Sequence, residues 1–180
     1  YEQWVKMHKE PLPTLMSTLE MRESEPLREM LIHGILRYAR EDTYLAWSLW
    51  QDTIKPNFAF SEAEIIEVEQ GLVLRAGWRH LSEANDMYAS VSEATLNEEA
   101  RQWRIRSALR AQDWKAVLKY IARLPANERE EQQWKYWKAR AWFETGSNVR
   151  AKGLFEDLAG RTSYYGFLAA EQLNKSYHFT

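Results

Sequence analysis

Apolar side chains recur along this sequence at the spacing of an α-helix, in short segments separated by turn residues. Leu27, Met30, Leu31, Ile35 and Tyr38 follow an i, i+3, i+4, i+8, i+11 pattern, which places them on one face of a helix. No segment alternates apolar and polar residues convincingly, as a half-buried strand does. Only 7 Gly and 5 Pro occur among 180 residues, so helix-breaking residues are scarce. The sequence therefore predicts an all-α fold.

Residues that favour helix N-termini precede many of these apolar segments. A side-chain oxygen at the N-cap accepts a hydrogen bond from a backbone N–H that the helix leaves unpaired. The candidates are, in chain order, Ser24, Asp42, Ser61 with Glu64, Thr95 with Glu98, Asp113, and Asn127 with Glu130. In two of the pairs, Ser61 with Glu64 and Thr95 with Glu98, the spacing is that of a capping box, in which each side chain bonds the other's backbone.

Proline and glycine mark where the predicted helices end. Lys55-Pro56-Asn57 and Leu124-Pro125 are expected ends because a proline disfavours helical geometry in the residue before it. Gly146 is expected to stop another helix, and Gly160 to separate the last two. Roughly nine or ten short helices joined by short turns result, and such turns produce antiparallel hairpins.

Aromatic and basic residues repeat with a period close to that of a helical hairpin. Trp103 and Trp137 lie 34 positions apart, and so do Arg106 and Arg140. This is the length of a tetratricopeptide-type helix pair, whose apolar stripe is buried only when neighbouring pairs stack on it. We therefore expect a right-handed superhelix (α-solenoid) of antiparallel helical hairpins, tetratricopeptide-like in architecture but without that family's strict consensus.

Composition excludes several classes of partner. The net charge is −2, from 24 basic and 26 acidic residues, which lacks the basic excess that nucleic-acid binding requires. No run of 18 apolar residues occurs, so no membrane span is expected, and the first residues do not resemble a signal peptide. The absence of cysteine rules out disulfides and a cysteine nucleophile.

No catalytic, cofactor-binding or metal-binding residues are predicted. The acidic clusters, Glu98-Glu99 and Glu128 to Glu131, have the character of solvated first turns of helices. The four histidines, His8, His33, His80 and His178, are far apart in sequence, with no His-x-x-x-His pair to indicate zinc. Gly-rich phosphate loops and Gly-x-Ser-x-Gly motifs are absent.

Nine tryptophans supply aromatic faces that either pack hairpins together or stack on sugars and peptides. Those on the repeat register, Trp103, Trp114 and Trp137, are predicted to belong to the core. The candidates to face a groove are Trp4, Trp47 and Trp50, because periodicity constrains them less.

Three segments of the second half of the chain carry a family resemblance. They are Gln102 to Arg110, followed by Asp113-Trp114 and Leu124-Pro125, then Trp134 to Ala141, then Ser163-Tyr164-Tyr165-Gly166-Phe167-Leu168-Ala169-Ala170. Over about residues 95–179 the chain resembles the superhelical (U-type) domain of soluble lytic murein transglycosylases. The last segment is similar to the point where that domain passes into the linker domain. The resemblance divides the chain into a superhelix segment, 1–160, and the start of a linker-domain helix, 161–180.

The resemblance implies a role for this chain within a larger enzyme. Enzymes of this family are periplasmic lyases whose lysozyme-like domain cleaves peptidoglycan between N-acetylmuramic acid and N-acetylglucosamine, leaving 1,6-anhydromuramic ends. The implied partners are the linker and catalytic domains of the same polypeptide, and glycan strands. The family's catalytic glutamate lies in a Glu-Ser dipeptide before Gly-Leu-Met-Gln; here Glu23-Ser24 lacks that sequel and is interpreted as coincidence. The chain alone is therefore expected not to be an enzyme.

The residues expected to contact the neighbouring domains are Arg161, Tyr164, Tyr165 and Phe167. Two alternatives stay open at this point. Curved helical repeats also serve as protein-interaction scaffolds, which would bind a protein partner and no glycan. An unrecognised active site among the acidic helices is the other, and it would reveal itself as glycosidase activity.

Overall fold

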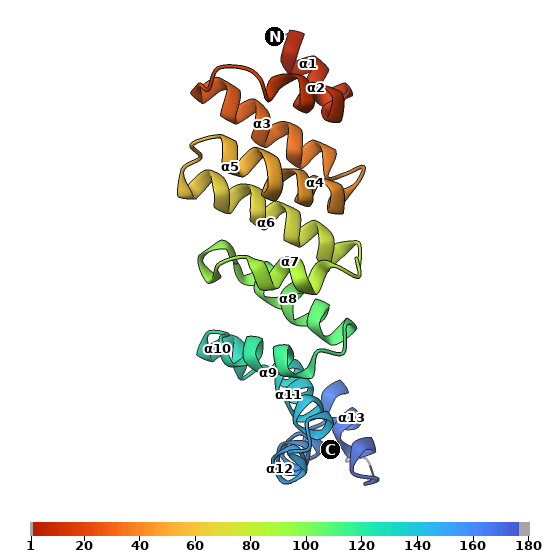
Figure 1. The fold of residues 1–180 in the computed structure, drawn as a ribbon. Helices are drawn as coiled ribbons and strands as arrows, with labels where there is room; N and C mark the ends of the chain where they lie inside the picture. Colours follow the sequence, from red (N-terminus) through yellow and green to blue (C-terminus); the bar gives the residue numbers. More distant parts are fainter. Residues whose placement is uncertain (1, 177–180) are drawn as a thin grey trace. The chain divides into compact units, whose positions relative to one another are not determined.

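The computed structural model describes residues 2–176, and within them all regular secondary structure is helical. The expectation of an all-α chain is confirmed for this part. Contacts divide the chain into two compact units, Tyr1–Trp103 and Arg104–Thr180, and each unit is described by itself. Figure 1 shows the helices of each unit folded back and forth as antiparallel hairpins.

The first unit consists of hairpins stacked in sequence order. Its elements are α1 (Glu2–Lys9), α2 (Pro11–Thr18), α3 (Glu25–Tyr38), α4 (Thr43–Leu49), the π-helix η1 (Trp50–Ile54), α5 (Lys55–Asn57), α6 (Glu62–Trp78), α7 (Ala84–Ser90), the 3₁₀ helix η2 (Glu93–Thr95) and the first part of α8 (Glu98–Arg110). Helix α3 packs against α1, α2, α4 and α6. It is thus the central element between the N-terminal helices and the next hairpin.

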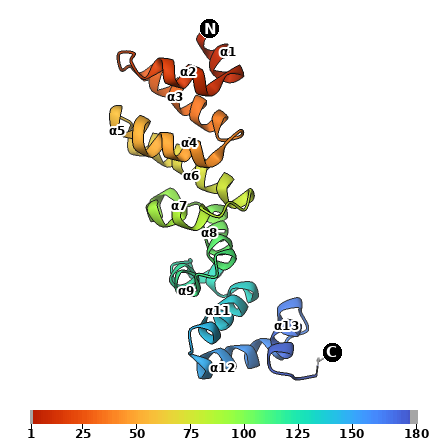
Figure 2. The same cartoon turned by 45° about the vertical axis from the view of Figure 1, so that its right-hand side comes forward.

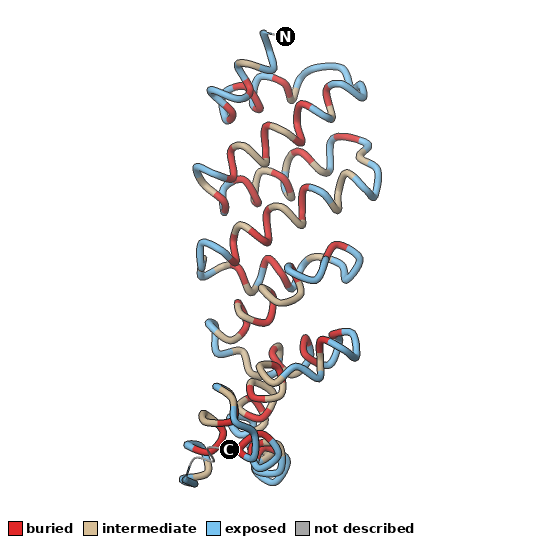
Figure 3. The backbone as a smooth tube through the Cα atoms, turned by 180° about the vertical axis from the view of Figure 1, so that it is seen from behind, coloured by how far each residue is buried: buried red, intermediate tan, exposed pale blue. Residues whose placement is uncertain are grey.

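A single apolar core runs through this unit. Leu31, Ile35, Val68 and Leu72 are fully buried, and they lie on the facing sides of α3 and α6. Figure 3 shows buried residues along the middle of these helices and exposed residues at the hairpin turns. Burying such side chains contributes roughly 1.5–3 kcal/mol each, so stacking of neighbouring hairpins stabilises the unit.

Of the four helix caps predicted in the first unit, two form with the expected side-chain hydrogen bonds. Asp42 accepts a hydrogen bond from the backbone N–H of Leu45 at 2.9 Å. Ser61 and Glu64 form the complete capping box at the start of α6. Ser24 occupies the N-cap of α3, with Pro26 in the first turn, but its side chain makes no capping bond.

The helix that begins at Thr43 ends at Asn57, within the predicted closing segment Lys55-Pro56-Asn57, but the residue before the proline stays helical. It continues through η1 and α5, so Lys55 is helical despite the proline that follows it. A proline ring inside an α-helix meets the carbonyl four residues earlier. The wider π-helical turn just before Pro56 loosens this spacing, which gives a physical reason why the helix carries on.

The predicted capping box of Thr95 and Glu98 is wrong. Thr95 is buried, and its hydroxyl lies 3.1 Å from that of Ser92 inside the turn that holds η2. Asn97 caps α8 instead, since its Oδ1 accepts from the backbone N–H of Ala100 at 2.9 Å. The start of the helix is therefore shifted by two residues.

The second unit holds the remaining part of α8, α9 (Trp114–Ala122), α10 (Ala126–Arg129), α11 (Gln132–Glu144), α12 (Asn148–Ala159) and α13 (Tyr164–Gln172). Helix α11 packs against α9, α12 and α13, and α12 also packs against α13 (Figure 2). Asp113 caps α9 by accepting from Ala116 N–H at 3.0 Å, as predicted. Gly146 adopts a positive φ of 84° after α11, the left-handed conformation expected of a glycine stop.

The predicted helix start at Asn127 and Glu130 is wrong. Asn127 lies inside the short helix α10, and α11 begins only at Gln132. Pro125 occupies the N-cap of α10, so a separate short helix precedes α11. The apolar periodicity of Trp134 and Ala141 predicted α11 itself correctly.

The tryptophans on the repeat register pack as predicted. Trp103 lies against the core of the first unit, while Trp114 and Trp137 lie against the core of the second, all partly buried. The predicted boundary at residue 160 stays a prediction. In the structure α13 packs on α11 and α12 within the second unit, and residues 177–180, together with His178, lie outside the described part.

Candidate functional site

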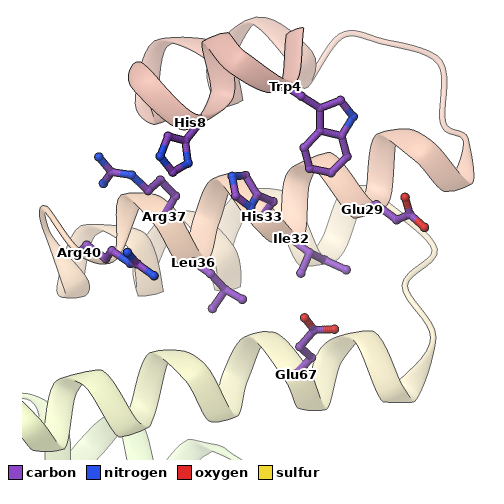
Figure 4. Close-up of a pocket in the computed structure, with 9 residues that line it drawn as sticks. All are labelled: Trp4, His8, Glu29, Ile32, His33, Leu36, Arg37, Arg40 and Glu67. Atoms are coloured by element: carbon purple, nitrogen blue, oxygen red, sulfur yellow. The ribbon is translucent and has the colours of Figure 1, made fainter. Parts of the chain in front are cut away.

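A pocket of about 490 Å³ opens in the first unit between α1, α3 and α6. Its lining residues are Trp4, His8, Glu29, Ile32, His33, Leu36, Arg37, Arg40 and Glu67. Figure 4 shows that α1 supplies Trp4 and His8, α3 supplies most of the wall, and Glu67 comes from α6. Residues far apart in sequence thus converge on one concave site.

Three aromatic rings form one wall of this pocket. The rings of His8 and His33 are stacked with centroids 5.7 Å apart, and Trp4 lies 5.5 Å from His33 in a tilted arrangement. Trp4 remains 39% exposed, so its indole face is available to a ligand. Met7, which is fully buried on the same helix, anchors α1 against α3 and so fixes the position of Trp4 and His8.

Gly34 explains how α1 comes so close to α3. A Cβ atom at Gly34 would collide with the sulfur of Met7 and approach Leu15 Cδ2 to 2.9 Å. Only a residue without a side chain leaves room for Met7 here. The wall of the pocket therefore depends on a glycine in the middle of α3.

The electrostatics of the pocket keep His33 uncharged at neutral pH. Its pKa is lowered from the ordinary value of 6.5, first by burial and then by the positive potential of His8, Arg40 and Arg37. The same concentration of positive charge extends to α6, where burial and the nearby Arg40 and Arg79 lower the pKa of Arg75. Positive potential gathers at one end of the pocket.

Of the three tryptophans predicted to face a groove, Trp4 lines the pocket described above. Trp50 is fully buried in the core and contacts Phe60 in a tilted arrangement, with ring centroids 4.9 Å apart, and Trp47 is 8% exposed. The prediction is wrong for Trp47 and Trp50. Both tryptophans belong to the apolar core of the first unit, a role that the sequence periodicity did not assign to them.

The contact between the two histidines and the role of the arginines were not predicted from the sequence. His8 and His33 are separated by 25 positions, and they become neighbours only because α1 folds back onto α3. No spacing within one helix signals such a contact. Trp4 is the only residue of the site that the sequence singled out.

The predicted interdomain residues lie together around α13 in the second unit. Tyr164 is 69% exposed and meets Tyr165 edge to face at 5.1 Å. Tyr165 is partly buried and packs on Tyr136, and burial raises the pKa of its phenol. Phe167 is partly buried, while Arg161 is exposed and pairs with Asp157 at 3.4 Å.

Gly166 is the residue that allows α13 to start so close to the turn that precedes it. A Cβ atom there would collide with the carbonyl oxygen of Arg161 and lie 2.9 Å from that of Leu158. Ser163 caps α13 through Gly166 N–H and donates a hydrogen bond to Gln132 Oε1 at 2.5 Å. The turn between α12 and α13 is therefore closely fitted.

These stacked hairpins define an all-α helical-repeat protein. The chain is similar to soluble lytic murein transglycosylases, with 32% identity to that of Salmonella typhimurium and 31% to that of Escherichia coli K12, over 74 residues in each case. The resemblance expected from the sequence is thus confirmed over part of the chain. No protein-family model matches the chain.

Solved structures of lytic transglycosylases share the fold. An inactive mutant of lytic transglycosylase Slt from Pseudomonas aeruginosa superposes with a TM-score of 0.85 over 98% of this chain at 24% identity. The 70-kDa soluble lytic transglycosylase of Escherichia coli gives a TM-score of 0.63 over 93% at 21% identity. A 70-kDa soluble lytic transglycosylase in complex with bulgecin A gives a TM-score of 0.65 over 97% of this chain at 20% identity. These likenesses confirm the fold class.

The chain is short beside these relatives. The matched segment covers 41% of this chain but only 12% of the curated relatives, and the chain spans 29% of the Pseudomonas aeruginosa structure. None of the helices formed by the described residues is long and apolar enough to cross a membrane.

Proposed function

We propose that this chain is a non-catalytic helical part of a periplasmic peptidoglycan lytic transglycosylase. It orients a lysozyme-like catalytic domain and guides glycan strands during cell-wall turnover. The observation that carries this proposal is the likeness to lytic transglycosylase Slt across 98% of the chain with a TM-score of 0.85. The 74-residue match to soluble lytic murein transglycosylases supports it independently.

The environments of the carboxyl groups support a non-catalytic role. A general acid for glycosidic cleavage requires a carboxyl group with a raised pKa. Here hydrogen bonds from Ser61 lower the pKa of Glu64, and Lys135 lowers that of Glu130. The buried carboxylate of Glu69 forms an ion pair with Lys55, with Nζ 2.7 Å away.

The proposed junction with the remaining domains is the end of the second unit. Residues 161–180 begin the linker segment, and Arg161, Tyr164, Tyr165 and Phe167 contact it or the catalytic domain. The large exposed fraction of Tyr164 supports this because solvent-exposed aromatic rings often become buried at interfaces.

The test combines binding and turnover on purified peptidoglycan sacculi. The chain is expected to sediment with sacculi and to release no 1,6-anhydromuropeptides by mass spectrometry, while a full-length soluble lytic transglycosylase releases them under the same conditions. Release by the chain itself would overturn the non-catalytic role. Failure to sediment, together with capture of a defined protein partner, would favour an interaction scaffold.

A further inference from the structure

The pocket beside Trp4 carries opposite charges at its two ends. Arg37 and Arg40 lie at one end with His8, and Glu29 lies at the other end with Trp4, above Glu67 (Figure 4). The middle is formed by Ile32 and Leu36 from α3. Such an arrangement matches a ligand with an anionic end, an apolar middle and a cationic end.

The charges available to a ligand are those without an internal partner. Arg37 pairs with Glu41 at 3.1 Å, whereas no ion pair joins Arg40, Glu29 or Glu67 to another residue of the described chain. Charged side chains grouped around a concave site without partners are poised to bind opposite charges.

Helix geometry gives the length of the matching ligand. Glu29 and Arg37 are eight positions apart on α3, about 12 Å at ~1.5 Å per residue. An extended peptide advances about 3.3–3.6 Å per residue. A chain of about four residues therefore spans the distance between the two ends.

We propose that this pocket binds a short peptide of about four residues with free ends, its carboxylate against Arg40 and Arg37 and its ammonium group against Glu29 and Glu67. Small apolar side chains lie on Ile32 and Leu36, and the indole of Trp4 covers the peptide. The inference rests on the pocket alone and holds whether or not the chain also guides glycan strands.

Tetra-alanine is the probe, titrated into the 180-residue chain and followed by calorimetry and by the NMR signals of the Trp4 indole and the His33 ring. Tetra-alanine with free ends should bind, and both resonances should shift. Amidating its carboxylate or acetylating its amino group should each weaken binding about fivefold or more, since a charge-assisted contact is lost in a partly exposed site.

Charge variants assign each end of the peptide. Arg40→Gln should weaken binding of the free peptide about fivefold and leave the amidated peptide unaffected, because both changes remove the same contact. Glu67→Gln should likewise weaken binding of the free peptide about fivefold and leave binding of the acetylated peptide unaffected. Arg150→Gln, an exposed arginine of the second unit, is the control and should change nothing.

Two results would overturn the proposal. Equal affinity for free and end-capped tetra-alanine would show that the charged ends are not recognised. Shifts of Trp4 and His33 with a neutral oligomer of N-acetylglucosamine, and none with tetra-alanine, would assign the pocket to sugars instead. If the chain bound tetra-alanine but did not sediment with sacculi, this inference would stand and the proposed guidance of glycan strands would fail.

Discussion

The imidazole rings of His8 and His33 stack with their centroids 5.7 Å apart, which joins the first helix of the chain to the third. Both rings belong to a wall completed by Trp4. Burial, and then the positive potential of His8, Arg40 and Arg37, lowers the pKa of His33. The surroundings of the His33 ring therefore oppose its protonation.

Acid should destabilise the first unit before any carboxylate titrates. The pKa of His33 is lowered from 6.5 in the folded chain, so the unfolded state binds the proton more readily, and the free energy of unfolding rises with pH across that window. Chemical denaturation at pH 5.5 should show a lower midpoint than at pH 7.5. His33→Gln should reduce this difference, and an unchanged difference in that variant would contradict the prediction.

Substitution of Ser61 should destabilise the chain, whereas substitution of Ser24 should not. Ser61→Ala removes both the acceptor for Glu64 N–H and the partner of the Glu64 carboxylate, which costs about 1 kcal/mol. Ser24 occupies the same position in α3 without a capping bond, so Ser24→Ala is the matched control. Urea unfolding of both variants measures the difference, and equal losses would refute it.

Alanine should have opposite effects at two glycines of the second unit. Gly166→Ala places a methyl group against the carbonyl oxygens of Arg161 and Leu158, and we expect a loss of about 2 kcal/mol or more from backbone displacement. Gly153 is exposed inside α12 with nothing within 4 Å. Gly153→Ala should therefore stabilise by about 0.5–1 kcal/mol. Thermal unfolding of both variants measures the two changes. An unchanged stability of Gly166→Ala would contradict the prediction and show that the turn adjusts to the added methyl group.

Removing the Lys55 ammonium group should lower the free energy of unfolding, because the Glu69 carboxylate then stays buried without its ion-pair partner. The Glu69 side chain is 6% exposed and lies 2.7 Å from Lys55 Nζ, so Lys55→Met leaves a buried carboxylate that still accepts a hydrogen bond from Gln51 Nε2. We expect a loss of about 1–3 kcal/mol. The double variant with Glu69→Leu should regain most of it, because no buried charge remains.

Lys175→Ala provides the comparison for this pair. Lys175 and Glu156 are 54% and 45% exposed at 3.4 Å, and breaking an exposed pair changes stability by less than about 0.5 kcal/mol. Urea midpoints of the three variants and the wild type test the ranking. A Lys55 variant no worse than the Lys175 variant would mean that Glu69 is well solvated or neutral.

The sequence correctly predicted helix caps that depend only on residues close together in the chain. Asp42 and Asp113 cap the helices that follow them, because a cap needs only a backbone N–H three residues away. Thr95 has the same spacing but is taken into a buried turn with Ser92. There the packing of η2 outweighs the local preference, and Asn97 caps the helix instead.

The pocket could not be derived in the same way. Its residues come from α1, α3 and α6, and their meeting depends on how tightly Met7 fits over Gly34. A glycine inside a helical apolar pattern was the available signal of close helix contact. The partner helix, and so the histidine pair, follows only from the three-dimensional arrangement.

The number of residues in the π-turn from Trp50 to Ile54 determines in which direction the side chains after it point. One residue of an α-helix corresponds to roughly 100° of rotation, so deleting a single residue here would turn every following side chain to another direction. Lys55 would swing away from Glu69, while Trp50 kept its place in the core. The wider turn therefore allows one helix to bury the indole of Trp50 and, one turn later, to place Lys55 beside the carboxylate of Glu69.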